Sequence, residues 1–163
     1  MMNDIRDLIE KLRTRHNLSV IEYETLVENF NEENAESLKQ YADKERKAYY
    51  GNKIFIRGLI EVSNICKNDC YYCGIRRSNG AVDRYRLTAD EILECVDAGY
   101  ELGFRTIVMQ GGEDSAFTDE FLVEVITKVK GKYPEIAITL SLGERSRESY
   151  LKLKAAGADR YLL

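Results

Sequence analysis

The sequence of 163 residues contains 24 Lys and Arg and 28 Asp and Glu, which gives a formal net charge of -4. Because neutralising phosphates requires a basic face, this acidic balance argues against general nucleic-acid binding. No apolar run approaches the ~18 residues of a membrane-spanning helix. The charged N-terminus lacks the apolar stretch of a secretory signal. We therefore expect a folded cytoplasmic protein that does not associate with nucleic acid or membranes.

The first part of the chain, residues 1–50, is predicted to be a helical extension. Ser19 and Glu22 have the spacing of a capping box and predict the start of a second helix. A third, strongly charged helix is expected over residues 34–50. The first helix is indicated by apolar residues at helical spacing, namely Ile5, Leu8, Ile9 and Leu12.

From residue 51 onward the pattern changes to strands that alternate with loops and helices. Alternation of this kind predicts an α/β fold with a parallel sheet. A complete eight-stranded barrel of this type requires about 250 residues. We therefore expect residues 51–163 to form about four βα units, the N-terminal half of a TIM-like barrel in a truncated chain. The expected strands are residues 54–62, 105–110, 135–140 and 160–163, and the expected helix starts are Thr88, Thr118 and Ser146.

Three of the 4 cysteines, Cys66, Cys70 and Cys73, lie close together in a C-x3-C-x2-C pattern after the first strand. A disulfide framework would spread its cysteines along a secreted chain, so a metal or redox role in a reducing compartment is favoured. Thiolates are the ligands of iron–sulfur clusters, and three of them leave one iron of a four-iron cluster open. A structural zinc site, the alternative, is closed by a fourth ligand. Cys95 shares a helical stripe with apolar neighbours and is expected to be a small buried hydrophobic residue.

The cysteine triplet, with the aromatic Tyr72 directly before its third member, resembles the signature of radical S-adenosylmethionine enzymes. The resemblance implies a radical SAM barrel and a 4Fe-4S cluster held by the three cysteines. It implies that the open iron chelates S-adenosylmethionine, whose reductive cleavage yields a 5′-deoxyadenosyl radical. It also implies that Tyr72 lies near the adenine. The alternative for Tyr72 is an ordinary loop aromatic.

Gly111-Gly112-Glu113, which follows the second expected strand, resembles the Gly-Gly-Glu motif of the same superfamily. The resemblance implies that this motif contacts the amino group of S-adenosylmethionine. Glycines also allow a backbone to approach a ligand closely. The alternative is a common turn at the end of a strand. Four residues at the end of the third strand are expected at the same site, unless they only begin the next helix. They are Ser141, Gly143, Glu144 and Arg145.

Within the superfamily, the sequence resembles the FeFe-hydrogenase maturation enzymes of the HydE type, in the biotin-synthase-like branch. That resemblance implies a small-molecule substrate, an electron donor such as ferredoxin or flavodoxin, and hydrogenase maturation proteins as partners. The alternatives are a biotin synthase or a methylornithine synthase, or a non-catalytic iron–sulfur or metal-binding fragment. The segments that carry the resemblance are residues 73–79, 84–87, 110–114, 141–145 and 156–163.

Overall fold

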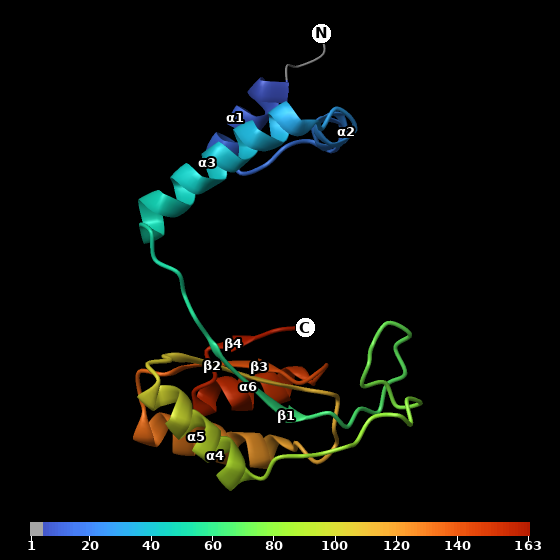
Figure 1. Cartoon of the computed structure of the whole chain (residues 1–163), viewed down its shortest axis with the longest axis vertical. Helices are drawn as coiled ribbons and strands as arrows, with labels where there is room; N and C mark the ends of the chain where they lie inside the picture. The colour runs from blue at the N-terminus through green and yellow to red at the C-terminus, as the bar shows by residue number, and fades with distance from the viewer. Residues whose placement is uncertain (1–4) are drawn as a thin grey trace. The chain divides into compact units, whose positions relative to one another are not determined.

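The computed structural model describes residues 5–163, and the chain divides into two compact units, Met1–Ile54 and Phe55–Leu163 (Figure 1). The first unit contains the helices α1 (Ile5–Arg15), α2 (Val20–Glu28) and α3 (Glu32–Tyr50). No helix in the described part of the chain is long and apolar enough to cross a membrane. The core of the first unit consists of Leu8, Ile9, Leu18 and Leu26.

Side-chain caps set where these helices begin. The capping box predicted for α2 is confirmed, since the Ser19 side chain accepts from the Glu22 N–H and the Glu22 carboxylate accepts from the Ser19 N–H. Helix α3 begins at Glu32, slightly earlier than predicted. The reason is Asn31, whose side-chain oxygen accepts from the Asn34 backbone N–H at 2.9 Å. An Asn cap satisfies one of the free donors of the first helical turn.

The second unit is built on a parallel sheet with the strand order β1-β2-β3-β4. This arrangement confirms the predicted α/β fold, with three βα units and a short fourth strand. Thr88 forms the predicted capping box with Glu91. The strands are β1 (Gly58–Ser63), β2 (Thr106–Gly111), β3 (Ala137–Ser141) and β4 (Arg160–Tyr161), and the helices are α4 (Ala89–Glu101), α5 (Asp119–Lys132) and α6 (Arg147–Ala156).

The helices of this unit cover one face of the sheet. Sequential parallel strands joined by right-handed crossovers place their helices on the same side, and Figure 1 shows α4 and α5 against one face. The strand residues that point toward them are buried, whereas Leu59, on the other face, is 56% exposed. The core under the helices includes Ile60, Val62, Ile107, Met109, Ile138 and Leu140.

The first strand is shorter than predicted. Residues 54–57 belong to no strand, and β1 begins at Gly58, where pairing with Ile107 of β2 starts. The apolar side chain of Ile54 is exposed. The prediction of a strand here is therefore confirmed, but its predicted start is too early. A strand also requires a neighbouring strand to pair with, and that pairing begins only at Gly58.

The prediction that Cys95 is buried is wrong. Cys95 is exposed on α4, although Ile92 and Val96 on the same helix are buried. One flank of α4, beside its buried face, carries Leu93 and Asp97. These two residues line a small groove together with residues of α5. Cys95 lies on the opposite flank and is left open to solvent.

Candidate functional site

Three loops meet at one edge of the sheet because they follow three neighbouring parallel strands. The cysteine loop, residues 64–79, follows β1, while the Gly-Gly-Glu segment ends β2 and residues 142–146 follow β3. Backbone hydrogen bonds join the first two. The Lys67 N–H donates to the Glu113 carbonyl at 3.1 Å, and the Gly112 N–H donates to the Ser63 carbonyl at 3.1 Å. The fold thus brings the two predicted motifs together.

The three cysteines of the loop are free thiols. Cys66 and Cys73 are half-buried, whereas Cys70 is exposed. The Cys73 N–H donates to the Cys70 carbonyl at 3.0 Å, so a tight turn separates these two residues. Within residues 5–163, no three Cys, His, Asp or Glu side chains converge closely enough to hold a single metal ion.

Gly111 and Gly112 allow the end of β2 to approach β1 and the cysteine loop. A Cβ placed on Gly111 would lie 2.9 Å from the Ser63 carbonyl oxygen. On Gly112 it would lie 2.3 Å from the Ile65 carbonyl oxygen and 2.8 Å from the Cys66 Cβ. Non-bonded carbon atoms prefer separations of about 3.5–4.0 Å. Glycine at position 112 is therefore required by the start of the cysteine loop itself.

Glu113 is held as an anion beside the cysteine loop. Its side chain is 19% exposed and forms an ion pair with Lys67 at 3.0 Å. The Lys67 ammonium lowers the pKa of the Glu113 carboxyl most strongly, while burial acts to raise it. Hydrogen bonds from the Glu144 backbone and the Asn68 side chain lower this pKa further. Gly143, at a φ of 78°, makes room for this side chain, since a Cβ there would lie 1.9 Å from the Glu113 Cγ.

An open cavity of about 650 Å³ lies between the cysteine loop and the residues Glu113 and Glu144. Its size is that of a site for a small organic ligand. A thiol, an ionised carboxylate and several polar groups face the same volume. The lining residues are Lys67, Asn68, Cys70, Glu113, Glu144, Arg145 and Ser146.

Most of the predicted site residues do not line this cavity. The side chain of Tyr72 is 93% exposed and does not line the cavity. Ser141 is half-buried at the end of β3, where it pairs with Gln110 of β2. The structure thus brings Cys70, Glu113, Glu144 and Arg145 to one cavity. Outside its lining lie the other predicted site residues, Cys66, Tyr72, Cys73, Gly111, Gly112, Ser141 and Gly143.

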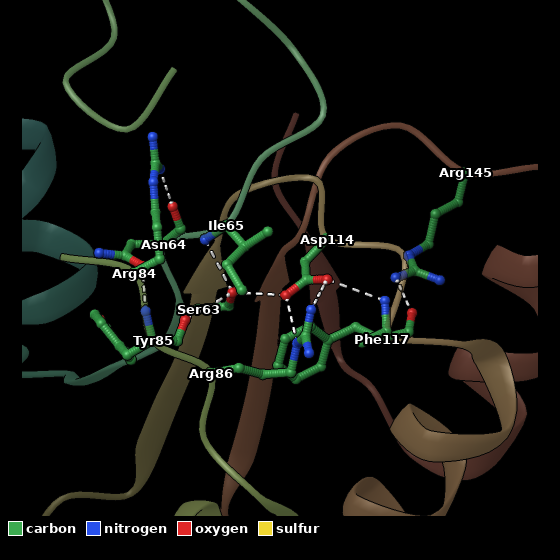
Figure 2. Close-up of polar contacts among 10 residues, drawn as sticks. Ser63, Asn64, Ile65, Arg84, Tyr85, Arg86, Asp114, Phe117 and Arg145 are labelled. Carbon is green, nitrogen blue, oxygen red and sulfur yellow. Dashed lines mark hydrogen bonds and ion pairs between the residues drawn. The ribbon is translucent and has the colours of Figure 1, made fainter. Parts of the chain in front are cut away.

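Asp114, next to Glu113, is the centre of a buried polar network (Figure 2). The residue is 6% exposed, and Arg86 donates to both carboxylate oxygens at 2.7 Å. The Ser63 hydroxyl donates at 2.8 Å and the Ala116 N–H at 3.0 Å. Burial raises the pKa of Asp114, but these donors together hold it below its usual value. The network fixes the segment after Glu113 to the end of β1.

Sequence reasoning did not single out Lys67, Arg86 or Asp114 as residues that build the site. The available signal was position, because Asp114 directly follows Glu113 and Lys67 directly follows Cys66. A buried carboxylate requires hydrogen-bonding partners. Which arginine supplies them depends on chain segments that are distant in sequence.

The family model of the radical SAM superfamily matches residues 60–163. The chain belongs to the radical SAM superfamily. The match extends from β1 to the last residue and includes the cysteine loop and the Gly-Gly-Glu segment.

Radical SAM proteins of known type are similar to nearly the whole chain. It is 42% identical to the FeFe hydrogenase maturase subunit HydE of Thermotoga maritima, over 97% of this chain and 44% of that protein. It is 33% identical to the 3-methylornithine synthase of Methanosarcina acetivorans, over 94% of this chain and 44% of that protein. A biotin synthase of Macrococcus caseolyticus is 34% identical over 71% of this chain. The chain thus spans less than half the length of these first two relatives.

Solved radical SAM structures share its fold. The crystal structure of the methylornithine synthase PylB superposes with a TM-score of 0.80 at 30% identity, covering 94% of this chain and 46% of that one. The FeFe-hydrogenase maturase HydG of Carboxydothermus hydrogenoformans gives a TM-score of 0.81 at 30% identity, covering 96% of this chain and 37% of that one. The α/β unit of this chain therefore has the fold of part of a radical SAM barrel.

The residues present fit the cofactors that this superfamily implies. Three free thiols in one loop supply the soft donors that an iron–sulfur cluster requires. The cavity beside Cys70 also contains the ionised carboxylate of Glu113, which suits a ligand with an ammonium group. The side chains present thus have the chemistry that a cluster and a cationic small molecule require.

Replacing Asp114 with asparagine is expected to lower the free energy of unfolding by about 1–2 kcal/mol at neutral pH, because a charge-assisted pair with the half-exposed Arg86 is lost. The lowered pKa of Asp114 means that the unfolded state binds its proton first. The difference between the two proteins is therefore present above the unfolded pKa and shrinks as the pH falls through the lower, folded pKa. Urea unfolding of both proteins between pH 7 and pH 3 measures it, and a difference that is constant with pH contradicts the assignment.

Proposed function

We propose that the chain carries the cluster-binding and cosubstrate-binding part of a radical S-adenosylmethionine enzyme. In this proposal Cys66, Cys70 and Cys73 bind a 4Fe-4S cluster, and S-adenosylmethionine occupies the cavity beside them. The observation that supports the proposal most is that Cys70 and Glu113, from two separate motifs, line the same cavity. When bound, the cluster supplies the electron that cleaves S-adenosylmethionine to a 5′-deoxyadenosyl radical.

In this proposal the residues of the chain bind S-adenosylmethionine and orient it. Glu113 accepts hydrogen bonds from the amino group of S-adenosylmethionine, in the place that the Lys67 ammonium takes in the structure. Gly111 and Gly112 let the backbone that carries Glu113 lie against the cysteine loop. Glu144 contributes a second acidic side chain to the cavity wall.

Tyr72 and Ser141 remain proposed contacts of the cosubstrate. Tyr72 stands directly before Cys73 in the loop, and Ser141 ends a strand at the same edge of the sheet. In this proposal Tyr72 lies near the adenine. Residues 1–50 then form a helical extension, and residues 51–163 form the half of the barrel that holds the cluster.

Among the processes of the three relatives compared above, we propose maturation of FeFe-hydrogenase as the one in which this chain acts. The HydE relative is the most similar of the three relatives compared above and matches almost the whole chain. The biotin synthase matches a smaller share of the chain. The proposed reaction acts on a small molecule, takes its electron from a donor such as ferredoxin or flavodoxin, and serves other maturation proteins.

Anaerobic reconstitution with iron and sulfide tests the proposed function. We expect about four irons per chain, an EPR signal on reduction that changes when S-adenosylmethionine is added, and release of 5′-deoxyadenosine from the complete protein. Binding of a single zinc ion in place of the cluster contradicts the proposal. An EPR signal that S-adenosylmethionine leaves unchanged contradicts the cosubstrate assignment.

Replacing Glu113 with alanine is expected to weaken S-adenosylmethionine binding by about one to two decades, because a charge-assisted hydrogen bond contributes roughly 1.5–3 kcal/mol. Titration of the reduced cluster followed by EPR measures the dissociation constant. Glu124→Ala is the matched control, since Glu124 also pairs with a lysine, Lys128, but on the exposed surface of α5. An unchanged constant in Glu113→Ala removes Glu113 from the site.

A further inference from the structure

The cysteine loop is held closed by one arginine that lies outside it. The Arg84 guanidinium donates hydrogen bonds to four backbone carbonyls, and Figure 2 shows it beside the carbonyl of Asn64. One acceptor precedes the first cysteine and three follow the last, so a single side chain joins both ends of the loop. The acceptors after the last cysteine are Ile75 at 2.8 Å, Arg76 at 2.8 Å and Asn79 at 3.0 Å.

Other cross-links continue the closure inside the loop. The Arg77 N–H donates to the Asn68 carbonyl at 2.9 Å, and the Ser78 N–H donates to the Asp69 side chain at 3.0 Å. These bonds pair the segment before Cys70 with the segment after Cys73. The two halves of the loop are therefore joined to each other by hydrogen bonds, in addition to the bonds that Arg84 makes to its two ends.

Arg84 itself stands on a fixed base. The next residues run beside the end of β1, where Arg86 forms a bridge with Ser63 and the Leu87 N–H donates to the Val62 carbonyl at 2.8 Å. The Asn64 side chain also accepts from the Tyr85 N–H at 2.8 Å. Arg84 can hold the loop in place only if its own backbone is fixed. The bonds of residues 85–87 to β1 and to Asn64 fix that backbone.

The geometry requires an arginine rather than any cation. The two terminal nitrogens of the Arg84 guanidinium each donate to two carbonyls, so this one planar group reaches four acceptors. A guanidinium presents five N–H donors in a rigid fork, whereas a lysine presents three donors on one nitrogen. Lysine at this position keeps the charge but cannot span both ends of the loop.

We propose that Arg84 is a positioning residue that orders the cysteine loop before a cluster binds. The inference depends on the proposed function, because it assigns the ordered loop to cluster assembly. Arg84 and its four hydrogen bonds are exposed, so water can replace a lost guanidinium. We therefore expect the barrel unit to stay folded without Arg84 while the loop becomes mobile. The cluster must then supply the ordering of its own ligands, which lowers its affinity.

The test compares Arg84→Lys with wild type in two decisive measurements, iron retention and hydrogen exchange, and in one supporting spectrum. We expect the reconstituted variant to lose its iron to a chelator about 10–100-fold faster, the range seen when groups that orient metal ligands are removed. We also expect backbone amides of the cluster-free cysteine loop to exchange hydrogen faster, with no change in β2 and β3. A shift in the EPR signal of the reduced cluster is a third expected sign.

Arg105→Lys is the matched control. Arg105 also donates to two backbone carbonyls, of Tyr100 at 3.0 Å and Phe104 at 2.8 Å, but it lies just before β2, at the opposite edge of the sheet. This variant is expected to keep wild-type iron retention and loop exchange. If Arg84→Lys matches wild type in either measurement, the inference about Arg84 is wrong.

The two measurements also separate the inference from the proposed function. Hydrogen exchange on the cluster-free chain needs no cluster, so it decides whether Arg84 orders the loop in every case. A wild-type chain that assembles no 4Fe-4S cluster refutes the proposed function. A wild-type chain that assembles one, with Arg84→Lys unaffected, refutes only the role of Arg84.

Discussion

Replacing Cys70 with alanine is expected to leave the fold intact and to remove nearly all of the bound iron and sulfide. Cys70 is exposed and does not belong to the hydrophobic core, so its truncation creates no cavity there. The variant retains two thiolates, which cannot hold a four-iron cluster that the wild type binds through three. Iron and sulfide should be counted after anaerobic reconstitution, with circular dichroism as the check on folding.

Cys95→Ala is the matched control, because Cys95 is also an exposed free thiol but lies on α4. It is expected to retain the full iron content. Cys66→Ala and Cys73→Ala are expected to lose the cluster as Cys70→Ala does. Full iron in Cys70→Ala, or loss of iron in Cys95→Ala, overturns the proposed ligand set.

The parts of the fold that sequence predicts well are those set by neighbours in the chain. The capping boxes at Ser19 and Thr88 were confirmed because their partners lie three residues away. The central apolar runs of β2 and β3 were also confirmed, because the middle residues of both strands are buried.

The errors share a different cause. Where β1 begins depends on where β2 lies beside it, and Cys95 is exposed because α5 covers the other flank of α4. Both facts follow from contacts between segments distant in sequence. A periodic apolar pattern specifies the centre of a buried face but not which of its edges a neighbour covers.

The candidate site divides in the same way. Cysteine spacing and the Gly-Gly-Glu segment are local patterns, and they were identifiable from the sequence. The network around Asp114 joins it to Arg86 and to Ser63, which is 51 residues away in the chain. Contacts at this separation are decided by the packing of the sheet, and so no local pattern indicates them.

Replacing Gly112 with alanine is expected to impair cluster binding and S-adenosylmethionine binding together. The added Cβ would lie 2.3 Å from the Ile65 carbonyl oxygen and 2.8 Å from the Cys66 Cβ. The first of these is a backbone atom, so the start of the cysteine loop or the end of β2 must move. Overpacking of this kind costs about 1–3 kcal/mol and occasionally more.

The control for this variant is Gly74→Ala, in the cysteine loop that Gly112 contacts, where an added Cβ meets nothing within 4 Å. That substitution is expected to change the free energy of unfolding by less than about 0.5 kcal/mol. Urea unfolding, iron content and titration with S-adenosylmethionine should be measured on both variants.

The two binding losses should appear together because Gly112 touches both motifs. Its backbone precedes Glu113 directly, and a Cβ added to it would lie 2.8 Å from the Cys66 Cβ. A shift that relieves the clash therefore moves either the first proposed ligand of the cluster or the carboxylate proposed for the cosubstrate, and changes the distance between them. Gly111→Ala should have a weaker effect, because its added Cβ would lie no closer than 2.9 Å to any neighbouring atom, the nearest being the Ser63 carbonyl oxygen. A Gly112→Ala protein that binds both cofactors as wild type does would show that the two motifs are not held in register by this contact.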